Sequence, residues 1–375
     1  MSRVLVADDQ TDILHALRLL LTELNCDIDL VNSVDGALAQ LERHTYDLLL
    51  MDLNYTRDTT SGREGLELLD RARTYDPMLP IVVMTGWGSI DTAVEAMRRG
   101  AKSFVQKPWD DAVLSEIVER ELADGVVLRQ RDTRHAREQE DARLIQRALL
   151  PSAMPHVDGC DIAARWQPAS GIGGDCYDLL RFSHARAGIS IADVVGKGLP
   201  AALLMSNLQA AVRAFATDGA ATRDVASSVN RLLSRNISAG KFVTFCYAVV
   251  DMAAGRIEYA NAGHNPPVLL RAGGGVEWLN ATGVVLGVFP DGVYDSRTVP
   301  FGPGDQLICY TDGITEAYDD RGEEFGADRL ITTVRRAGAR AAAADTVDAV
   351  TAAVAVWTGG TVQDDATLIV VARNA

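Results

Sequence analysis

The amino-acid sequence predicts an α/β protein built from two domains, and three observations support this prediction. The chain has 375 residues, too many for one ordinary hydrophobic core and enough for two. Residues 3–122 alternate short apolar runs with amphipathic segments, the pattern of a parallel sheet covered by helices on both faces. Residues 151–375 contain short strands separated by Gly, Pro and Asn turns, with helices in pairs, which indicates an α/β sandwich of antiparallel sheets.

The composition narrows the class of function. The formal net charge of -15 argues against a nucleic-acid-binding output, because phosphate backbones are bound by clustered Lys and Arg side chains. The five cysteines are scattered without a CxxC pair, which favours reduced, buried thiols over disulfides or a zinc site. No apolar run reaches the roughly 18 residues of a membrane span, and the N-terminus begins a strand instead of a signal peptide. We therefore expect a cytoplasmic protein with no membrane partner.

Five strands are expected in the first domain, each followed by a helical segment. They lie at VLVAD, DIDLV, DLLLMD, PIVVMT and SFVQK. In a doubly wound sheet, functional groups collect at the carboxyl ends of the strands. The polar residues that follow these strands are Asp8 and Asp9, Asp52, Thr85, and Lys107.

Three carboxylates with a lysine and a hydroxyl form a site for a hard divalent cation, most simply Mg²⁺, and for a phosphoryl group. The acids would bind the metal, Lys107 would neutralise phosphoryl oxygens, and one acid would serve as nucleophile. Acids at strand ends also cap helices or face water, which is the better explanation for any one of them. That alternative does not account for the whole set, so the sequence favours the phosphoryl site.

Residues 3–122 resemble the receiver domain of two-component response regulators, through the motifs ADD, LLLMDLN, VVMTG and FVQKP. The resemblance implies a flavodoxin-like, five-stranded parallel sheet in which Asp52 accepts phosphate from a sensor histidine kinase. Thr85 and Phe104 are then the switch residues, and Lys107 contacts the phosphate. A Mg²⁺ ion is also implied, with ligands from Asp8, Asp9, Asp52 and, through its backbone carbonyl, Asn54.

The segment after Asp52 departs from the receiver pattern. Where the family usually has a short loop with a proline, this chain has the longer NYTRDTTSGREGLELL. Because this loop lies beside the phosphorylation site, the sequence leaves open which kinase acts on the domain and how fast the phosphate is lost. It still predicts that Asp52 is phosphorylated.

Residues 123–150 are expected to form a helical connector, interrupted or weakened near Gly125. Its middle positions are mostly Arg, Asp, Gln and Glu, so a solvated charged helix is favoured over a coiled coil, with a homodimer through the connector as the alternative. The connector's apolar face is expected to pack on the second domain and consists of Leu144, Ile145, Ala148 and Leu149.

Four acids of the second domain share one local setting, at an end of an apolar run and beside glycine or another acid. They are Asp175 in GGDCYD, Asp193 in ADVVGKG, Asp312 in YTDGITE and Asp364 in VQDDATL. Carboxylates beside apolar strands are costly to bury, and no matching set of Lys or Arg accompanies them. Ligands that are all oxygen favour Mg²⁺ or Mn²⁺, and two such ions can clamp a phosphate ester and activate water.

Other interpretations of these motifs fit less well. The Gly196-Lys197 pair lacks the earlier glycine and the following Ser or Thr of a P-loop. Taken by itself, the TDG motif is better explained by a turn than by a metal site. Turns do not explain why four acid motifs occur in this order. GGDCYD is similar to the GGDEF signature of cyclic-dinucleotide synthases, yet Cys176 stands where that signature has glutamate.

The ordered set resembles the PPM-type (type 2C), metal-dependent serine/threonine phosphatases, in the bacterial branch associated with sporulation and stress response. Between Ala142 and Ala372, the motifs LLP, PASGIGGDCYD, ADVVGKGLPAALLM, ANAGHNPP, YTDGITEA and DDATL follow the family's order. The resemblance implies a substrate that is a phosphorylated protein, specifically an anti-sigma-factor antagonist. It also implies two Mn²⁺ or Mg²⁺ ions bridged by Asp193 and held further by the Val194 carbonyl, Asp175, Asp312 and Asp364.

Four further residues are candidates for supporting roles. We interpret His264 as a turn histidine hydrogen-bonded to the backbone, in preference to a general acid. Asp365 and Asp178 are expected to orient neighbouring groups. Arg165 is a weak candidate for binding phosphate, because arginine side chains are usually solvated.

Together these features predict a response regulator whose output is phosphoprotein hydrolysis. We expect phosphorylation of Asp52 to increase that activity through the connector and the helix LPAALLMSNLQAAVR that follows Asp193. One alternative is a connector that only tethers independent domains, and another is a catalytically silent phosphatase fold that binds a partner. A transcription factor is disfavoured by the charge and by the lack of a basic recognition helix.

Overall fold

The computed structural model describes residues 1–55, 62–86, 90–169, 171–237, 240–338 and 340–374. The chain divides into two compact units, Met1–Arg137 and Glu138–Ala375.

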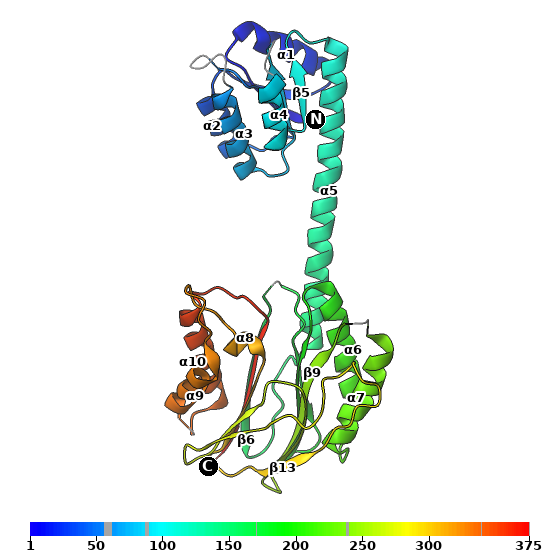
Figure 1. Ribbon diagram of the computed structural model, residues 1–375, viewed down its shortest axis with the longest axis vertical. Coiled ribbons are helices and arrows are strands. Elements are labelled where there is room, and N and C mark those ends of the chain that lie inside the picture. The colour runs from blue at the N-terminus through cyan, green and yellow to red at the C-terminus, as the bar shows by residue number, and fades with distance from the viewer. Residues whose placement is uncertain (56–61, 87–89, 170, 238–239, 339, 375) are drawn as a thin grey trace. The chain divides into compact units, whose positions relative to one another are not determined.

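The first unit contains a five-stranded parallel sheet with the strand order β2-β1-β3-β4-β5 (Figure 1). The sequence-based prediction of a doubly wound parallel sheet is confirmed. The strands are β1 (Arg3–Ala7), β2 (Asp27–Val31), β3 (Leu48–Asp52), β4 (Ile81–Thr85) and β5 (Ser103–Gln106). The helices that follow the first four strands are α1 (Thr11–Glu23), α2 (Val34–Arg43), α3 (Arg63–Tyr75) and α4 (Ile90–Arg98).

Two apolar clusters lie on the opposite faces of this sheet because successive side chains of a strand point to opposite sides. Leu5 of β1 packs in the cluster that contains the buried side chains of α2 and α3. Its neighbour Val4 packs in the other cluster, with the apolar side chains of α1 and of α5 (Asp111–Leu149). All residues of β3 and β4 are buried, as expected of central strands covered on both faces.

The helix α5 is continuous from Asp111 to Leu149, so the interruption predicted near Gly125 is wrong. The glycine has another explanation. Gly125 is buried, and a Cβ atom at this position would lie 2.8 Å from Pro80 Cγ. Close packing, not helix breaking, therefore requires glycine here. The division into 1–122, 123–150 and 151–375 stays a prediction.

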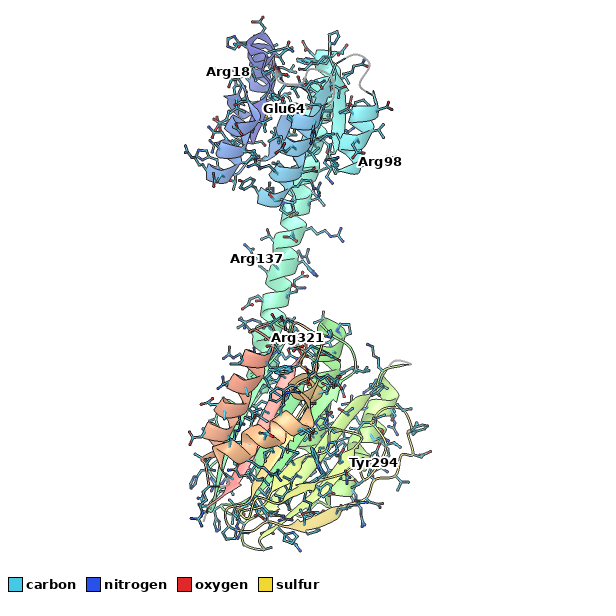
Figure 2. All side chains as sticks on the ribbon, turned by 60° about the vertical axis from the view of Figure 1, so that its left-hand side comes forward. Arg18, Glu64, Arg98, Arg137, Tyr294 and Arg321 are labelled. Carbon is cyan, nitrogen blue, oxygen red and sulfur yellow. The ribbon has the colours of Figure 1, made fainter. Side chains whose placement is uncertain are left out.

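The charged middle of α5 is solvated, as predicted. Residues 130–141 are all exposed, and Figure 2 shows the side chains around Arg137 projecting away from the helix. The predicted apolar packing face at the end of α5 is confirmed for Leu149, which packs against the main core of the second unit. It is wrong for Leu144 and Ile145, which are 52% and 65% exposed, and for the exposed Ala148. Gln146, in the part of the helix that belongs to the second unit, is buried, and so is Leu150 just after the helix.

The second unit contains two five-stranded antiparallel sheets, ordered β13-β10-β9-β8-β7 and β12-β11-β14-β15-β6. In Figure 1, α6 (Leu199–Phe215) and α7 (Thr222–Asn236) flank the first sheet, while α9 (Gly326–Ala337) and α10 (Ala343–Trp357) flank the second. The predicted α/β sandwich is confirmed. The first sheet's strands are β7 (Cys176–Arg181), β8 (Arg186–Val194), β9 (Val243–Asp251), β10 (Arg256–Ala262) and β13 (Arg297–Pro300). The second sheet's strands are β6 (Cys160–Gln167), β11 (Val268–Leu270), β12 (Val276–Trp278), β14 (Gln306–Tyr310) and β15 (Ala366–Arg373).

The main core of this unit lies between the two sheets and continues under α6 and α7. Phe245 of β9 meets Leu307 of β14 and Ile369 of β15 in this cluster. A second cluster fills the space between the outer face of the second sheet and the helices α9 and α10, with Ile308 and Leu330 among its members. Each sheet is therefore fixed on both faces, which holds the strand ends in place.

The cysteines are buried, as the sequence analysis predicted. Cys26, Cys160, Cys176, Cys246 and Cys309 are all free and buried. Of the helices in the described ranges, none has the length and apolar character of a membrane span.

We predict that Gly125→Ala destabilises the first unit although alanine favours helix by about 1 kcal/mol. The added methyl group must displace the Pro80 ring, and overpacking of this kind costs about 1–3 kcal/mol. Hydrogen–deuterium exchange of β3 and β4 peptides in the full chain measures the effect. Asp124→Ala, at the exposed neighbouring position, is the control and should leave exchange unchanged. Slower exchange in Gly125→Ala would contradict the packing explanation.

Candidate functional site

The carboxyl ends of β1, β3 and β5 bring a lysine and two acids together in the first unit. Lys107 Nζ donates to Asp8 Oδ2 at 2.6 Å and to Asp52 Oδ2 at 2.8 Å. Both carboxylates are buried, with Asp8 fully inaccessible. Carboxylate oxygens of Asp8, Asp9 and Asp52 lie within 4.8 Å of one another. The structure thus assembles these strand-end groups at one point.

This cluster fits a divalent cation. Asp52 Oδ1 is buried and has no hydrogen-bond partner among the described residues. Burial raises the pKa of Asp8, even though Lys107 opposes the shift. One lysine does not neutralise three carboxylates, and a hard cation with oxygen ligands would remove the remaining repulsion. Asn54, which the resemblance assigns as a backbone ligand, follows Asp52 by two residues and has a buried side-chain oxygen.

The other receiver residues occupy distinct positions around this cluster. Thr85 is buried at the end of β4, whereas Phe104 on β5 is 49% exposed. Within the segment predicted as a long loop, Tyr55 donates its hydroxyl to the Ala7 carbonyl at 3.1 Å. The sequence analysis missed this tyrosine. Residues 56–61 of the loop lie outside the described residues.

In the second unit, strand pairing brings the four acids to one edge of the sandwich. Asp175 directly precedes β7, and Asp193 lies near the end of β8, where Cys176 pairs with Ala192. Asp312 begins the short helix α8 (Asp312–Thr315) after β14, and Asp364 precedes β15. These last two strands are antiparallel neighbours, which places the end of one beside the start of the other.

The charges of these acids repel one another. Burial and, after it, repulsion from the carboxylates of Asp312 and Asp364 raise the pKa of Asp193 to about 7. Burial followed by repulsion from Asp193 raises the pKa of Asp175 well above its ordinary value. The pKa of Asp312 is also raised, by burial and then by Asp364. Each acid therefore makes ionisation of its neighbours harder, which is the signature of a site that needs cations.

One carboxylate oxygen in this cluster has an unmet bonding requirement. Asp175 Oδ2 accepts hydrogen bonds from Thr311 Oγ1 at 2.7 Å and from Thr367 Oγ1 at 2.6 Å. Its other oxygen, Oδ1, is buried without a partner among the described residues. An unsatisfied buried acceptor costs about 1–3 kcal/mol, and a metal ion would satisfy it. The residues therefore fit a divalent cation. The sequence analysis missed Thr311 and Thr367, although each stands within three residues of a predicted acid.

The four acids are spread more widely than those of the first unit. Across the described ranges, Asp8, Asp9 and Asp52 are the one set of three acids whose oxygens lie within 4.8 Å of one another. A wider spread of the acids suits two metal ions, because each ion has ligands of its own and the two ions share only a bridging group. Lys197 Nζ lies 3.2 Å from Asp364 Oδ1 at the exposed rim.

A tightly packed loop leads to Asp175. Asp365 Oδ1 accepts a hydrogen bond from the Ala169 amide at 2.8 Å, and its Oδ2 accepts one from Gly174 at 2.6 Å. A Cβ atom on Gly174 would lie 2.7 Å from the Val194 carbonyl oxygen. Glycine is thus required for the loop to approach the backbone beside Asp193, and Asp365 holds the loop in that position.

Two other predicted residues, Asp178 and Arg165, each pair with a charged side chain of a helix. Asp178 on β7 accepts a hydrogen bond from Arg213 Nε of α6 at 2.6 Å, so it ties strand to helix. Arg165 on β6 pairs with Asp348 of α10 at 2.6 Å, with both side chains exposed.

His264 is buried and takes part in a local network. Its Nδ1 lies 2.9 Å from Thr244 Oγ1, and its backbone amide donates to Asn261 Oδ1 at 2.8 Å. Burial lowers the pKa of His264 to about 4, so the ring is neutral near pH 7. At that pH the ring is not in the protonated form that a histidine general acid uses. The geometry therefore gives it a structural role next to Thr244, which pairs with Asp193 across β8 and β9.

Comparisons with known proteins agree with this description. Residues 4–119 match the model of the response regulator receiver domain, and residues 183–374 match that of stage II sporulation protein E (SpoIIE). Protein IcfG of Synechocystis sp. is 28% identical over 289 residues, covering 70% of this chain and 44% of that protein. Phosphoserine phosphatase RsbU of Bacillus subtilis is 33% identical over 184 residues, covering 49% of this chain and 55% of that protein. The chain thus spans about half the length of these relatives.

Solved structures support the fold of the second unit. The SiaA-PP2C domain of Pseudomonas aeruginosa superposes with a TM-score of 0.57 at 23% identity, covering 65% of this chain and 98% of that one. The RsbU and RsbW domains of Rv1364c from Mycobacterium tuberculosis give a TM-score of 0.51 at 28% identity, covering 60% and 64%. Fold and sites together define a receiver domain joined to a PP2C-type α/β sandwich. The chain belongs to the SpoIIE family, whose model matches slightly more than half of it.

We predict that His264 makes the second unit less stable in acid. Its folded pKa of about 4 lies below the ordinary value of about 6.5, so the unfolded state binds a proton first as the pH falls. The contribution of His264 to the free energy of unfolding is complete above pH 6.5 and declines towards pH 4. At pH 5 this contribution is smaller by about 2 kcal/mol. Hydrogen–deuterium exchange of β9 and β10 peptides at pH 7 and pH 5, corrected for intrinsic rates, measures this.

The matched variants are His264→Gln and, at an exposed position of the same unit, His184→Gln. The loss of protection between the two pH values should be smaller in His264→Gln than in the unaltered protein. It should be the same in His184→Gln. An equal loss in all three proteins would contradict the prediction.

Proposed function

We propose that this protein is a response regulator whose output is the hydrolysis of a phosphorylated protein. The observation that carries the proposal is Asp175, a fully buried carboxylate with an unpartnered oxygen, surrounded by acids that raise one another's pKa. Such an arrangement is costly unless it binds cations, and cations at an open edge can act on a phosphate ester. The receiver fold and the SpoIIE family membership support the same conclusion.

In this proposal, two Mn²⁺ or Mg²⁺ ions are held by Asp175, Asp193, Asp312, Asp364 and the Val194 carbonyl. When bound, such ions supply an acidified water molecule and neutralise charge on the phosphate ester. The protein's own residues orient the ligands. Thr311 and Thr367 fix the carboxylate of Asp175, and the loop held by Asp365 fixes its backbone. Lys197 adds a positive charge at the rim, where a phosphate dianion approaches.

The proposed substrate is a phosphoserine or phosphothreonine of a protein. RsbU and RsbP of Bacillus subtilis, both similar to this chain, are named phosphoserine phosphatases. The sequence resemblance to the sporulation and stress-response branch extends the proposal to a phosphorylated anti-sigma-factor antagonist.

The proposed input is a sensor histidine kinase that phosphorylates Asp52, with Mg²⁺ bound by Asp8, Asp9, Asp52 and the Asn54 carbonyl. The buried Oδ1 of Asp52, which has no hydrogen-bond partner among the described residues, supports the proposed Mg²⁺ site at this carboxylate. Lys107, already paired with Asp8 and Asp52, would then neutralise the new phosphate.

The end of α5 is the proposed route from input to output. Gln146 Nε2 donates to the Gly173 carbonyl at 2.6 Å, and the Gly173 amide donates to Gln146 Oε1 at 3.0 Å. Gln209 of α6 donates to the carbonyl of Leu149, the last residue of α5. A movement of α5 would therefore shift both the loop before Asp175 and the helix after Asp193. A coupling of about 1–3 kcal/mol suffices to change activity several-fold.

We predict that the protein hydrolyses p-nitrophenyl phosphate and a phosphoserine protein in the presence of Mn²⁺. Asp193→Ala should lower kcat/KM by about 1000-fold, because it removes the ligand that both ions share. Asp320→Ala, an exposed acid outside the cluster, serves as the control. Undiminished activity in Asp193→Ala would overturn the mechanism. Tight Mn²⁺ binding without hydrolysis would instead identify a silent binding module.

We also predict that phosphorylation of Asp52 raises the hydrolysis rate. The assay treats the full chain with acetyl phosphate and Mg²⁺ and compares it with Asp52→Ala, which should not respond. Gln146→Ala should lose most of the response because it breaks the link to Gly173, whereas Gln130→Ala on the exposed part of α5 should keep it. Equal rates under all conditions would mean that α5 is only a tether, and a fall would reverse the sign.

A further inference from the structure

We propose that a pocket next to the acids of the second unit binds one apolar side chain of the phosphoprotein substrate and so determines which phosphorylated sequences are hydrolysed. This inference rests on the proposed function. The pocket lies between the second sheet and the end of α10. Its walls come from β6, β15, α8, α10 and the segment 358–364.

The pocket has an apolar interior. Leu368 of β15, Ile314 of α8 and Ala317, two residues after α8, are buried in the cluster between the sheet and its helices. Val354 of α10 completes this wall, and Val362 adds a partly exposed apolar side chain at the edge. The pocket is therefore a place where the outer core of the sheet opens to solvent. Covering such a surface with an aliphatic side chain is favourable, because it removes apolar area from water.

The size of the pocket restricts its occupant. The cavity volume is about 80 Å³. Sites for nucleotides and other small-molecule ligands usually enclose about 300–1000 Å³. A pocket this small fits one side chain, such as leucine, isoleucine or methionine, and is too small for a cofactor.

The pocket is continuous with the acid cluster. Asp364, one of the four acids, is also a lining residue, and so is Gly313, which directly follows Asp312. An extended peptide advances about 3.3–3.6 Å per residue. A substrate segment whose phosphorylated residue reaches the acids therefore carries its neighbouring side chains across the mouth of the pocket. This continuity identifies the occupant as part of the substrate.

The edge of the pocket contains fixed polar groups that would orient the segment. Arg165 lines the wall on β6, where its ion pair with Asp348 of α10 holds it at 2.6 Å. Lys197 Nζ lies 3.3 Å from the Gln363 carbonyl in the segment that forms the rim. Arg165 therefore acts here as a wall of the pocket and not as a ligand for phosphate.

The test uses phosphoserine peptides that differ at one position, with leucine or aspartate at each site within four residues of the phosphoserine. The full chain with Mn²⁺ should favour leucine by at least about 10-fold in kcat/KM at one site, as expected for burial of an aliphatic group. No preference at any site would overturn the inference while leaving the proposed function intact. If neither the peptides nor p-nitrophenyl phosphate were hydrolysed, the proposed function would fail, and the inference with it.

Variants of α10 connect the preference to the pocket. Ala355→Phe places a ring in the mouth and should bring the ratio of leucine to aspartate peptide rates close to 1. Ala352→Phe, also exposed on α10 but outside the lining, should keep the preference. Thr351→Phe, on the same helix face as Ala355, gives a second obstruction in case the first variant folds poorly. A leucine preference that persists in both Ala355→Phe and Thr351→Phe would overturn the proposal.

Discussion

The burial of negative charge is the constraint on which both halves of this protein depend. In the second unit, Asp175 is fully buried, and the hydroxyls of Thr311 and Thr367 are both directed at one of its oxygens. The loop before it is held by Asp365 and approaches the Val194 carbonyl so closely that only glycine fits at position 174. These contacts orient the carboxylate but add no positive charge. The fold thus concentrates repulsion at one edge of the sandwich, and a cation is the chemical group that would relieve it.

The two acid clusters differ in how positive charge is placed beside their carboxylates. In the first unit, Lys107 bridges two buried carboxylates, and three acids lie close enough to share one ion. That arrangement suits an acid that itself accepts a phosphoryl group, with a lysine ready to pair with the product. In the second unit the cation at the rim, Lys197, is exposed, and the acids are spread more widely. That arrangement suits ions that act on an external phosphate, which is the role we propose for it.

At the end of α5, a polar contact takes the place of the apolar contact that the sequence predicted for Leu144 and Ile145. The sequence favoured Leu144 and Ile145 as the packing face, yet both are exposed. The buried residue is Gln146, whose amide pairs in both directions with the Gly173 backbone. Hydrophobic periodicity predicts burial of apolar side chains, but an unpaired backbone amide and carbonyl next to a helix also need partners, and glutamine supplies both at once. The pair links the end of α5 to the loop before Asp175, which fits the regulatory role we propose for it.

The sequence by itself determined the two folds and the positions of the acids in the chain. Strand and helix periods are local properties, and an acid at the end of a strand follows from that local pattern, as for Asp52 and Asp193. The tertiary structure decided which distant groups meet. Thr367 reaches Asp175 across 192 positions of the sequence, and Gly125 is required by the ring of Pro80. The pocket lined by Asp364 forms between two helices and two strands. No local pattern encodes such contacts, because they depend on the register and packing of segments that are far apart in the chain.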